Sequence, residues 1–343
     1  LHTYRVAQVR FGTELVGLEQ DDDGVTITLR DVASGDTSLV RSRFVVGADG
    51  ARSTVRDLLG VAMVGPDRLV DHATVLFEAP MWDVVAERRY GLYVITHPDA
   101  EGIFVPCGPG DRWLYGQELE SGRPHPSEYA EAEAVRLIRA AAGVPTLQPR
   151  ILRTGTFSFA AQIADRYGDR RAFLVGDAAH RVTPRGGTGM NTAIHDGHDL
   201  GWKLGWVLRG WVPADLLATY ETERRPVGLA NTTRSAHPDG TRLGAADALS
   251  RDLGDRVRHA WVRPGVSTLD LLGPGYTLLT GPDGSHWRRR APAELAGRVP
   301  LDVRAVDDLT AAILGIGGHG AVLLRPDGLP SPLGRRRVAD LLQ

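Results

Sequence analysis

The sequence predicts a chain of mixed α/β and α+β type with several domains, and three patterns lead to this prediction. A buried strand, Ala172–Val175, ends in Gly176-Asp177 and is followed by a Pro/Gly loop and by a helix from about Met190. Between residues 64 and 125, short apolar runs alternate with turns, which is typical of an antiparallel sheet. From Thr268 onward, strands and helices alternate as in a small α/β unit. A length of 343 residues is enough for two or three domains.

Composition and charge exclude several classes of function. Hydrophobic residues make up 42% of the chain and charged residues 24%, which is ordinary for a globular protein. The formal net charge of -2 gives no basic footprint, so we do not expect a nucleic-acid partner. No apolar run approaches the ~20 residues of a membrane span, and no signal peptide is visible. The single cysteine, Cys107, lies in a Pro/Gly turn and is expected to be buried. It suits a reducing cytoplasm.

The first half of the chain predicts sheets joined by short helices. Residues 9–48 form a β-ribbon in which Asp21-Asp22-Asp23-Gly24 is the hairpin turn. The expected strands of the first half are Glu14–Glu19, Val25–Leu29, Phe44–Gly47, Ala73–Phe77, Tyr90–Thr96, Gly102–Val105, Trp113–Gln117 and Arg150–Phe157. A helix over Ser53–Leu59 follows the ribbon. A second helix has Ser127 as its N-cap and Gly143 just past its end.

The second half predicts one long helix and then a separate unit. The helix runs from about Met190 to Leu208, and Glu221–Pro226 ends its unit. Gly197, Gly201 and Gly205 share one face, and each costs about 1 kcal/mol relative to alanine, so we expect a neighbouring backbone to pack closely there. After a polar connection, the expected elements are Tyr276–Thr280, Ala291–Ala296, Val299–Val303, Val306–Leu314 and Ala321–Leu324. Pro330 and Pro332 oppose strand pairing beyond them.

The segment Arg171–Asn191 carries the strongest functional signal. An acid at the carboxyl end of a strand can accept hydrogen bonds from sugar hydroxyls, and glycine N–H groups at a helix start favour negative charge. This combination indicates a flavin. An ordinary βα junction would also contain Gly and Asp, but the following Pro184–Asn191 run favours the functional interpretation.

A second motif spans Val45–Arg56. Asp49-Gly50 is compatible with a simple turn, and Arg52 and Arg56 with solvated helix charges. However, the two arginines are four residues apart, so they share a face at the start of a helix. Two guanidiniums beside helical N–H groups can hold a pyrophosphate.

Together the two motifs resemble those of the class A FAD monooxygenases, the single-component flavoprotein aromatic hydroxylases. The resemblance implies that FAD and the NAD(P)H pyrophosphate are contacted by the first motif, through Asp49, Gly50, Arg52, Ser53 and Arg56. It implies that Asp177, between Gly176 and Ala178, binds the ribityl chain. The same resemblance places six residues near the isoalloxazine: Pro184, Gly187, Thr188, Gly189, Met190 and Asn191.

The resemblance also implies a domain plan. A Rossmann-like FAD/NAD(P)-binding domain would comprise residues 1–63 and 159–230, with an antiparallel substrate sheet inserted at 64–158. A linker at 231–266 would lead to a thioredoxin-like domain at 267–343. That domain has no C-x-x-C motif, so it is expected to be structural or to provide an oligomer contact, with a homodimer as one expectation. Tyr93, Phe104 and Trp113 are the candidate substrate residues, each with an even chance of being core.

One feature of the family is missing from the sequence. Nothing before Asp49 matches the opening G-x-G-x-x-G fingerprint, so we expect that about a hundred residues of the family pattern are absent. Gly315–Gly320 matches its letters, but a helix precedes it and a strand follows, which is the reverse of the required context. We interpret it as a turn.

The implied reaction is hydroxylation of a phenolic or polyketide aromatic ring, with NAD(P)H as reductant and O2 as oxidant through a flavin C4a-hydroperoxide. Two alternatives stay open: another flavin enzyme of the same fold, such as a halogenase or reductase, and a non-catalytic fragment or accessory chain. His195-Asp196 and His198-Asp199 suggest a metal, but no third ligand cluster accompanies them, so we expect none.

Overall fold

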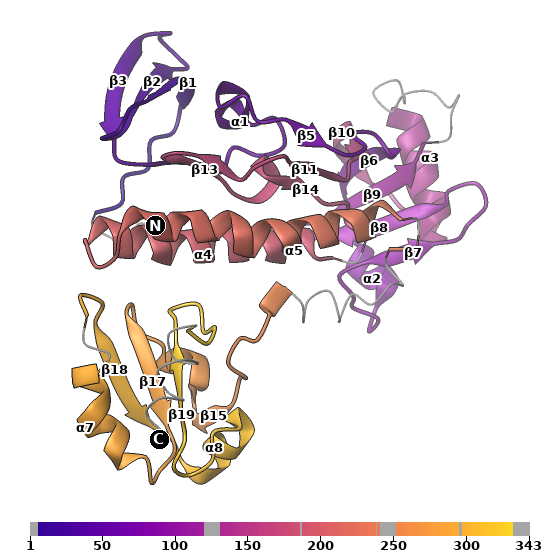
Figure 1. Cartoon of the computed structure of the whole chain (residues 1–343). Helices are drawn as coiled ribbons and strands as arrows, with labels where there is room; N and C mark the ends of the chain where they lie inside the picture. Colours follow the sequence, from indigo (N-terminus) through magenta and orange to yellow (C-terminus); the bar gives the residue numbers. More distant parts are fainter. Residues whose placement is uncertain are drawn as a thin grey trace. The chain divides into compact units, whose positions relative to one another are not determined.

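The computed structural model describes residues 6–119, 131–185, 187–237, 239–240, 252–294 and 297–331. The chain divides into two compact units, one made of Leu1–Val64 and Ile163–Gln343 and the other of Gly65–Gln162 (Figure 1). The smaller unit is therefore an insertion in the larger one. Strands β5 (Met63–Val64) and β11 (Gln162–Ala164), where the chain passes between the units, pair antiparallel with Met63 opposite Ala164.

The larger unit begins with the predicted β-ribbon, a three-stranded antiparallel sheet of β1 (Thr13–Gln20), β2 (Val25–Asp31) and β3 (Thr37–Ser42). Asp21 closes the first hairpin, because its Oδ1 accepts hydrogen bonds from the amides of Asp23 and Gly24 at 2.8 and 3.0 Å. The hairpin prediction at Asp21–Gly24 is confirmed.

A second sheet joins distant parts of the sequence. β4 (Val45–Gly47) pairs in parallel with β13 (Ala172–Leu174), which pairs in turn with β12 (Gly168–Asp169). Helix α1 (Thr54–Leu58) follows β4, and a Cβ on Gly47 would lie only 2.8 Å from Val55 Cβ, so glycine allows strand and helix to pack closely. A third sheet contains β14 (His180–Arg181), β11 and β5.

Two long helices support these sheets. α4 (Gly189–Leu208) leads through a 3-10 turn at Ala214–Leu217 to α5 (Ala218–Ala236). The pairs Thr192–Asn231 and Lys203–Glu223 show that the helices run antiparallel. The sequence analysis expected this part to end at Pro226. The helix α5 instead continues to Ala236, into the expected linker. An interior proline costs about 3 kcal/mol. Here, buried polar contacts of Arg224 and Asn231 hold the helix on both sides of it.

The glycine stripe on α4 has a different environment from the one predicted. Among the described residues, no atom lies within 4 Å of a Cβ built on Gly197 or Gly201, and Gly205 meets only the guanidinium of Arg209. The predicted close backbone packing is therefore wrong for the described part of the chain, because this face of α4 has no packing partner there.

The inserted unit is an antiparallel sheet, as predicted, and it has five strands in the order β10-β6-β9-β8-β7. Its strands are β6 (Val70–Glu78), β7 (Tyr93–Ile95), β8 (Gly102–Pro106), β9 (Arg112–Glu118) and β10 (Arg150–Phe159). The short helix α2 (Met81–Val85) and the helix α3 (Glu131–Ala142) complete the unit. Ser127, the expected N-cap, lies outside the described residues.

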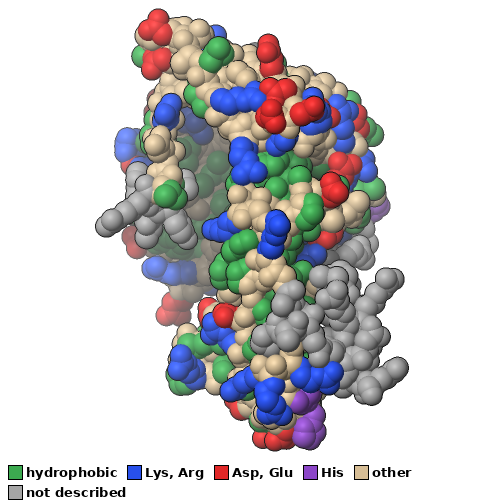
Figure 2. All heavy atoms as spheres, turned by 60° about the vertical axis from the view of Figure 1, so that its left-hand side comes forward, with side chains coloured by type: hydrophobic (Ala, Val, Ile, Leu, Met, Phe, Trp, Pro, Cys, Tyr) green, Lys and Arg blue, Asp and Glu red, His purple; other side chains and the backbone are tan. Residues whose placement is uncertain are grey.

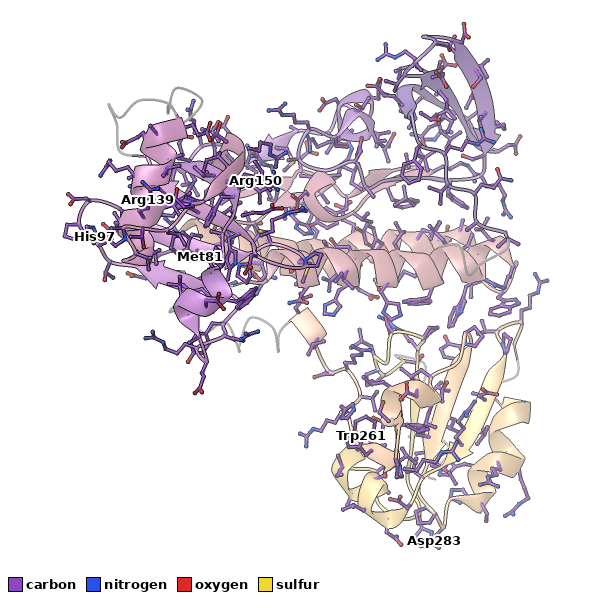
Figure 3. The ribbon with its side chains drawn as sticks, turned by 180° about the vertical axis from the view of Figure 1, so that it is seen from behind. Met81, His97, Arg139, Arg150, Trp261 and Asp283 are labelled. Carbon is purple, nitrogen blue, oxygen red and sulfur yellow. The ribbon has the colours of Figure 1, made fainter. Side chains whose placement is uncertain are left out.

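Helix α3 covers one face of this sheet. Ala134, Leu137 and Ile138 of α3 pack into the same buried cluster as the strand residues Val75 and Phe77. Gly143 follows the helix with a φ of +66°, as its predicted capping position requires. Arg139 anchors the helix end by donating to the carbonyl of Leu147 at 2.7 Å (Figure 3).

The C-terminal part of the larger unit has the alternating pattern that the sequence predicts. Its elements are β15 (Trp261–Arg263), β16 (Val266–Ser267), a 3-10 turn at Thr268–Leu271, β17 (Tyr276–Thr280), α7 (Ser285–Glu294), β18 (Leu301–Ala305), α8 (Asp308–Leu314) and β19 (Ala321–Leu324). β17 pairs in parallel with β18 and antiparallel with β19. This βαβ unit with an added antiparallel strand is consistent with a thioredoxin-like domain.

Three local expectations for this part need comment. α7 starts at Ser285, before the predicted Ala291, because Trp287 is buried and donates to the carbonyl of His319. The turn interpretation of Gly315–Gly320 is confirmed, with Gly315 capping α8 at a φ of +70°. Pro330 does form an antiparallel bridge, to Leu324, because the amide of Ser331 donates to Leu323 in its place. Pro332 lies outside the described residues.

The surface mixes charges of both signs. Figure 2 shows Lys and Arg side chains interspersed with Asp and Glu over the visible face. Within the described residues, no helix combines the length and apolar character that a bilayer span requires. Cys107 is half-buried rather than buried, because β8 has ended before it and its turn lies at the sheet edge.

Candidate functional site

The strand β13 ends in a tight turn that exposes Asp177. Gly176 adopts a φ of +60°, a conformation that favours glycine, and begins a 3-10 turn over Gly176–Ala178. A Cβ on Gly176 would lie 3.2 Å from the Cβ of Ala193, so α4 packs directly against the turn. Ala178 is fully buried, whereas the Asp177 carboxylate is exposed and has no hydrogen-bond partner among the described residues. It is therefore free to accept hydrogen bonds from a ligand.

Among the described residues, no side chain caps the N-terminus of α4. The first helical bond runs from the Thr192 amide to the Thr188 carbonyl, so the amides of Gly189, Met190 and Asn191 precede it. The Thr188 side chain accepts no bond from them, because its hydroxyl instead accepts from Arg234 at 2.8 Å. Free amides at a helix start attract negative charge.

The loop before α4 leaves room beside these amides. Gly187 has a φ of +64°, and no atom of the described residues lies within 4 Å of a Cβ built on it. Its amide donates to the carbonyl of the exposed Pro184. A flavin requires three features here: an acceptor for the ribityl hydroxyls, amide donors for the electron-poor ring, and space beside the ring. The exposed Asp177 carboxylate, the free amides at the start of α4 and the glycine at position 187 match these features. The residues present therefore fit FAD.

A buried polar cluster, which we call the cofactor-side network, supports the turn at Gly176–Ala178. It consists of His180, Thr192, Asp196, Arg224 and Asp252. Asp196 is fully buried and accepts from the Gly176 amide at 3.2 Å, and it lies 2.6 Å from His180 Nε2. Arg224 of α5 donates to Asp196 at 3.0 Å and to Asp252 at 2.7 Å. The turn that presents Asp177 is thus tied to both helices.

Within the cofactor-side network, electrostatics favour the charged forms of Asp252 and Arg224. Burial alone would raise the pKa of Asp252, but hydrogen bonding to His195 and the charge of Arg224 lower it below its usual value. Burial likewise opposes the charge of Arg224, but Asp196 and Asp252 outweigh it and raise its pKa. A third tie comes from Tyr220, whose hydroxyl donates to the Leu174 carbonyl at the end of β13.

The second predicted motif lies beside the first. Asp49 caps α1, because its carboxylate accepts from the Ser53 hydroxyl at 2.5 Å and from the Val55 amide at 3.0 Å. Gly50 has a φ of +80°. Ser53 accepts from the Arg56 amide. The α1 start, which was expected to offer its amides to a pyrophosphate, has thus satisfied two of them with its own side chains.

Arg52 and Arg56 do not share a helix face as the spacing predicted. α1 begins only at Thr54, so Arg52 lies before the helix and is exposed. Arg56 is buried and donates to the carbonyls of Ala178 and Ala51 at 3.2 and 3.1 Å. Its guanidinium therefore joins the two motifs, a contact that the sequence analysis missed.

The predicted substrate residues occupy the covered face of the inserted sheet. Tyr93, Phe104 and Tyr115 pair across neighbouring strands, and Trp113 lies two residues from Tyr115, so all four point to one side. That is the side of α3. Phe104 and Trp113 are 2% and 0% exposed, and the Tyr93 hydroxyl donates to the carbonyl of Arg88. These side chains are core.

No described element of the inserted unit covers the opposite face of the sheet, and we call it the open face. It carries Leu76, Leu114 and Val105 in one cross-strand row and Thr74 with Ile103 in the next. Beyond them, His72 stacks on Phe157 and Phe159 with ring centroids 5.2 and 4.0 Å apart. The period-two alternation of the strands identified the two faces, but it could not tell which one α3 covers.

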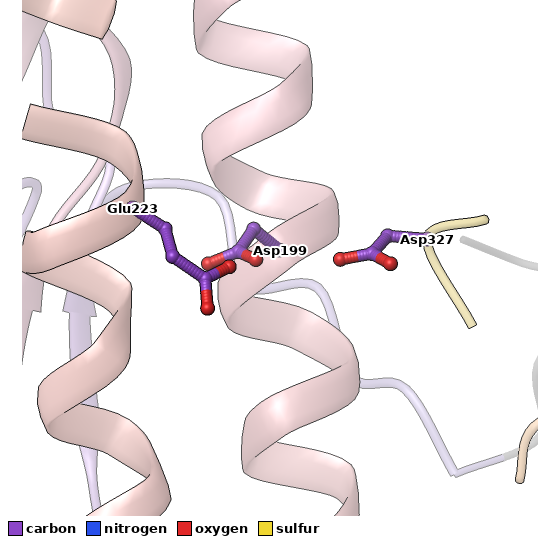
Figure 4. A group of neighbouring side chains, drawn as sticks. All are labelled: Asp199, Glu223 and Asp327. Carbon is purple, nitrogen blue, oxygen red and sulfur yellow. The ribbon is translucent and has the colours of Figure 1, made fainter. Parts of the chain in front are cut away.

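A group of three carboxylates raises the metal question again. Oxygens of Asp199, Glu223 and Asp327 lie within 4.8 Å of one another (Figure 4). Lys203 lies 2.7 Å from Asp199, and Arg325 binds Glu223 and Asp327 at 2.8 and 2.6 Å. Because Lys203 and Arg325 already pair with these three acids, the group is an ion-pair cluster, which we call the C-terminal network. His195 contacts Asp252 at 3.3 Å, and His198 is exposed.

Known proteins share these features. A family model described as FAD binding domain matches residues 2–235. The chain is 33% identical to the tetracenomycin A2 monooxygenase-dioxygenase of Streptomyces glaucescens, over 94% of this chain and 68% of that protein. It is 35% identical to aklavinone 12-hydroxylase of Streptomyces peucetius, over 84% of this chain and 67% of that protein.

Solved structures agree with these matches. An aklavinone-11 hydroxylase solved with FAD and aklavinone has a TM-score of 0.81 and 32% identity, and the match covers 94% of this chain and 70% of that one. A flavin-dependent monooxygenase, PieE, solved with FAD and substrate, also has a TM-score of 0.81, with 29% identity over 95% of this chain and 73% of that one. The two motifs, their geometry and these similarities together establish that the chain belongs to the family of FAD-dependent aromatic hydroxylases, which are flavoprotein monooxygenases.

Proposed function

We propose that this chain hydroxylates a phenolic or polyketide aromatic ring, using FAD, NAD(P)H and O2. The observation that carries the proposal is the segment Ala172–Asn191, in which an exposed Asp177 and an uncapped helix start are held in place by a buried polar network. Bound FAD supplies the two-electron reduction and the activation of O2.

Each part of the loop has a role in this proposal. The Asp177 carboxylate accepts hydrogen bonds from the ribityl hydroxyls. Pro184 and Gly187 line the ring. The amides of Gly189, Met190 and Asn191 donate to the pyrimidine edge, where negative charge develops on reduction. A helix start stabilises such charge by about 0.3–1 kcal/mol at an exposed site.

The first motif serves the phosphates. Arg52 is exposed beside Gly50 and makes no hydrogen bond or ion pair with the described residues, so it is available to the pyrophosphate of FAD or NAD(P)H. Arg56 is a positioning residue, because it fixes the carbonyl of Ala178 next to Asp177. The aromatic substrate is assigned to the open face of the inserted sheet, whose side chains are mainly aliphatic and aromatic.

Flavin binding tests the proposal directly. The full chain is titrated with FAD, and the quenching of flavin fluorescence gives the dissociation constant. We expect Asp177→Ala to weaken binding about tenfold, because hydrogen bonds to a charged acceptor are worth about 1.5–3 kcal/mol. Asp165→Ala is the matched control, since that carboxylate is half-exposed and lies before β13.

The outcome separates the alternatives. FAD uptake that depends on Asp177, together with NAD(P)H oxidation stimulated by a phenol, supports the hydroxylase. Uptake that is equal in the variant, or no uptake by the wild-type chain, contradicts the assignment of this loop.

A further inference from the structure

A cavity lies against the C-terminal sheet β18-β17-β19, and we call it the C-terminal cavity. Its volume is about 680 Å³, which is within the range of small-molecule sites. Helix α8, strand β19 and residues 253–259 contribute to its walls. These elements all belong to the larger unit, and the described lining residues include none from residues 172–191. The cavity is therefore separate from the flavin loop.

The alternation of side chains on β19 places this cavity on the face of the sheet opposite α7. Leu323 packs with Leu278 and with Trp287 of α7 in one buried cluster. Its neighbours Val322 and Leu324 point to the other face and line the cavity. Leu324 is fully buried, but Val322 is only half-buried, so the described side chains do not fill this face.

The walls of the C-terminal cavity are mainly aliphatic. A folded chain normally covers such side chains, because burial of apolar surface is the main favourable contribution to folding. Among the described lining residues none is Phe, Tyr or Trp, so the walls suit an aliphatic chain better than an aromatic ring. The aliphatic side chains that stay half-buried or exposed there are Val257, Leu269, Ile313, Val322 and Pro330.

Arg256 brings a fixed positive charge to this apolar surface. It lines the cavity, it is half-buried, and its buried Nε has no hydrogen-bond partner among the described residues. Its stem lies against Gly328, which has a φ of +81°, because a Cβ built on that glycine would lie 3.2 Å from Arg256 Cγ. A buried charged donor without a partner is costly, and a guanidinium is well suited to a carboxylate. Arg256 is therefore available to an anionic ligand.

Arg258 adds a second guanidinium from the same segment. It is exposed, and its side chain makes no hydrogen bond or ion pair with the described part of the chain. Its backbone is held in place, because its carbonyl accepts from the hydroxyl of the buried Thr268 at 2.6 Å. The Thr268 amide donates to the Ala260 carbonyl at 2.9 Å, and the Val257 amide donates to the Gly328 carbonyl at 2.8 Å. The segment that carries both arginines is thus anchored on either side of Arg258.

The charge balance of the cavity also favours an anion. Besides the two arginines, the described lining residues include His259 and a single acid, the exposed Asp255. Asp270 lies near His259, but its carboxylate accepts hydrogen bonds from the amide and the hydroxyl of Ser267 at 2.7 and 2.9 Å. The lining residues therefore carry an excess of positive charge.

From the aliphatic walls and the unpaired arginines we propose that the C-terminal cavity binds a monocarboxylate with an aliphatic chain. Its carboxylate pairs with Arg256 and Arg258, and its chain covers the half-buried aliphatic side chains. Binding at this site does not depend on the proposed reaction.

The test uses three probes: decanoate, its neutral amide decanamide, and the shorter octanoate. Isothermal titration calorimetry of the full chain measures affinity and stoichiometry and needs no turnover. We expect one decanoate per chain, bound about tenfold more tightly than decanamide because the guanidiniums pair with the carboxylate. Octanoate is expected to bind about tenfold more weakly than decanoate, because it buries two fewer methylene groups.

A charge variant tests the role of Arg256. Arg256→Gln keeps most of the side-chain volume but removes the charge, so the preference for decanoate over decanamide is expected to disappear. Arg263→Gln is the matched control, because Arg263 is an exposed arginine of β15 that does not line the cavity. It should keep the preference of the wild-type chain.

A second variant tests the cavity without relying on charge. Ala312 lines the cavity from α8 and is exposed, so a larger side chain there takes up cavity space without displacing a buried one. We expect Ala312→Phe to bind decanoate at least about tenfold more weakly and to keep its far-ultraviolet circular dichroism. Leu309→Phe, an exposed position of α8 outside the lining residues, should leave binding unchanged.

Several results would overturn the proposal. The wild-type chain could fail to bind decanoate saturably, or could bind more than one per chain as a detergent does. Equal affinity for decanoate and decanamide, or a retained preference in Arg256→Gln, would remove the role of the arginines. Undiminished binding in a folded Ala312→Phe chain would place the ligand elsewhere. If Ala312→Phe does not fold, the probe comparison and Arg256→Gln decide the question.

Discussion

Two networks of buried charge lie on the same helix pair, α4 and α5, and comparing them shows how partners decide what a carboxylate does. Asp196 and Asp199 are three residues apart on α4, and both follow a histidine in sequence. Asp196 accepts hydrogen bonds from the backbone amide of Gly176 and from the guanidinium of Arg224. Asp199 pairs with Lys203 beside Glu223 and Arg325, near the C-terminal strands. The first supports a loop, and the second joins α4 and α5 to the segment that follows β19.

The networks also differ in charge balance. In the C-terminal network, three acids share two bases, and burial raises the pKa of Asp199 to about 6 despite the nearby Lys203. In the cofactor-side network, Asp252 keeps a pKa below its usual value, because hydrogen bonding and the Arg224 charge outweigh burial. Asp199 in the C-terminal network therefore has a raised pKa, whereas Asp252 in the cofactor-side network has a lowered one.

The largest expected effect comes from removing the cation of the cofactor-side network. Arg224→Met leaves Asp196 and Asp252 buried without their shared partner, so we expect the free energy of unfolding to fall by about 3–5 kcal/mol. Chemical denaturation of the full chain measures it. Arg225→Met is the control, because among the described residues Arg225 donates one hydrogen bond, to the Ala164 carbonyl, and its loss should cost about 1 kcal/mol. Equal losses for the two variants would break the comparison.

Flavin affinity separates the two aspartates. Asp196→Asn weakens the tie to the Gly176 amide and to His180, so the turn that presents Asp177 loosens. We expect the dissociation constant of FAD to rise about tenfold, or 1.4 kcal/mol. Asp199→Asn should leave it within about twofold. A comparable loss of FAD affinity in both variants would show that the networks act as one.

The smallest effect is a difference in pH dependence. The pKa of Asp199 is about 6 in the folded chain, and an unfolded aspartate has a pKa of about 4. Between pH 6 and pH 4, Asp199 is protonated in the folded chain but still charged in the unfolded chain. The free energy of unfolding that this group contributes therefore rises as the pH falls from 6 to 4. Asp199→Asn should be more stable than wild type at pH 7 and lose that advantage near pH 4.

For Asp252 we expect the stability to change with pH in the opposite direction. Because its folded pKa is lowered, its contribution to stability is present above about pH 4 and is lost as the pH falls further. Denaturation curves of Asp199→Asn and Asp252→Asn across pH 3–7 measure both trends. Parallel pH profiles for the two variants would contradict the assignment of different charge balances.

Local sequence patterns predicted most of the structure of the segment Ala172–Asn191. Ala172–Leu174 is apolar and is followed by Gly176-Asp177, so strand, turn and helix follow from residue types alone, and Asp177 is exposed. The supporting residues were not predicted. His180, Asp196 and Arg224 become one network only when α5 folds back along α4, which no local pattern encodes.

The structure differs from the sequence analysis, or decides what it left open, at two places that have the same physical origin. The spacing of Arg52 and Arg56 suggested one helix face, but the helix begins after Arg52 because Ser53 and Asp49 cap it there. Alternation along the inserted strands separated two faces but left Phe104 and Trp113 equally compatible with the substrate side and with the core. The packing of α3 decides which face is covered, and both residues belong to the covered face. Both cases depend on contacts between elements.

The pairing of β5 with β11 has a consequence for how this protein family can diversify. Met63 and Ala164 lie opposite each other, so the chain leaves and re-enters the larger unit at neighbouring points. An insertion with adjacent ends can be lengthened, shortened or exchanged without moving the residues that flank it. Such a junction is modular: recombination or engineering can place a different sheet between residues 65 and 162 while the flanking strands β5 and β11 stay paired.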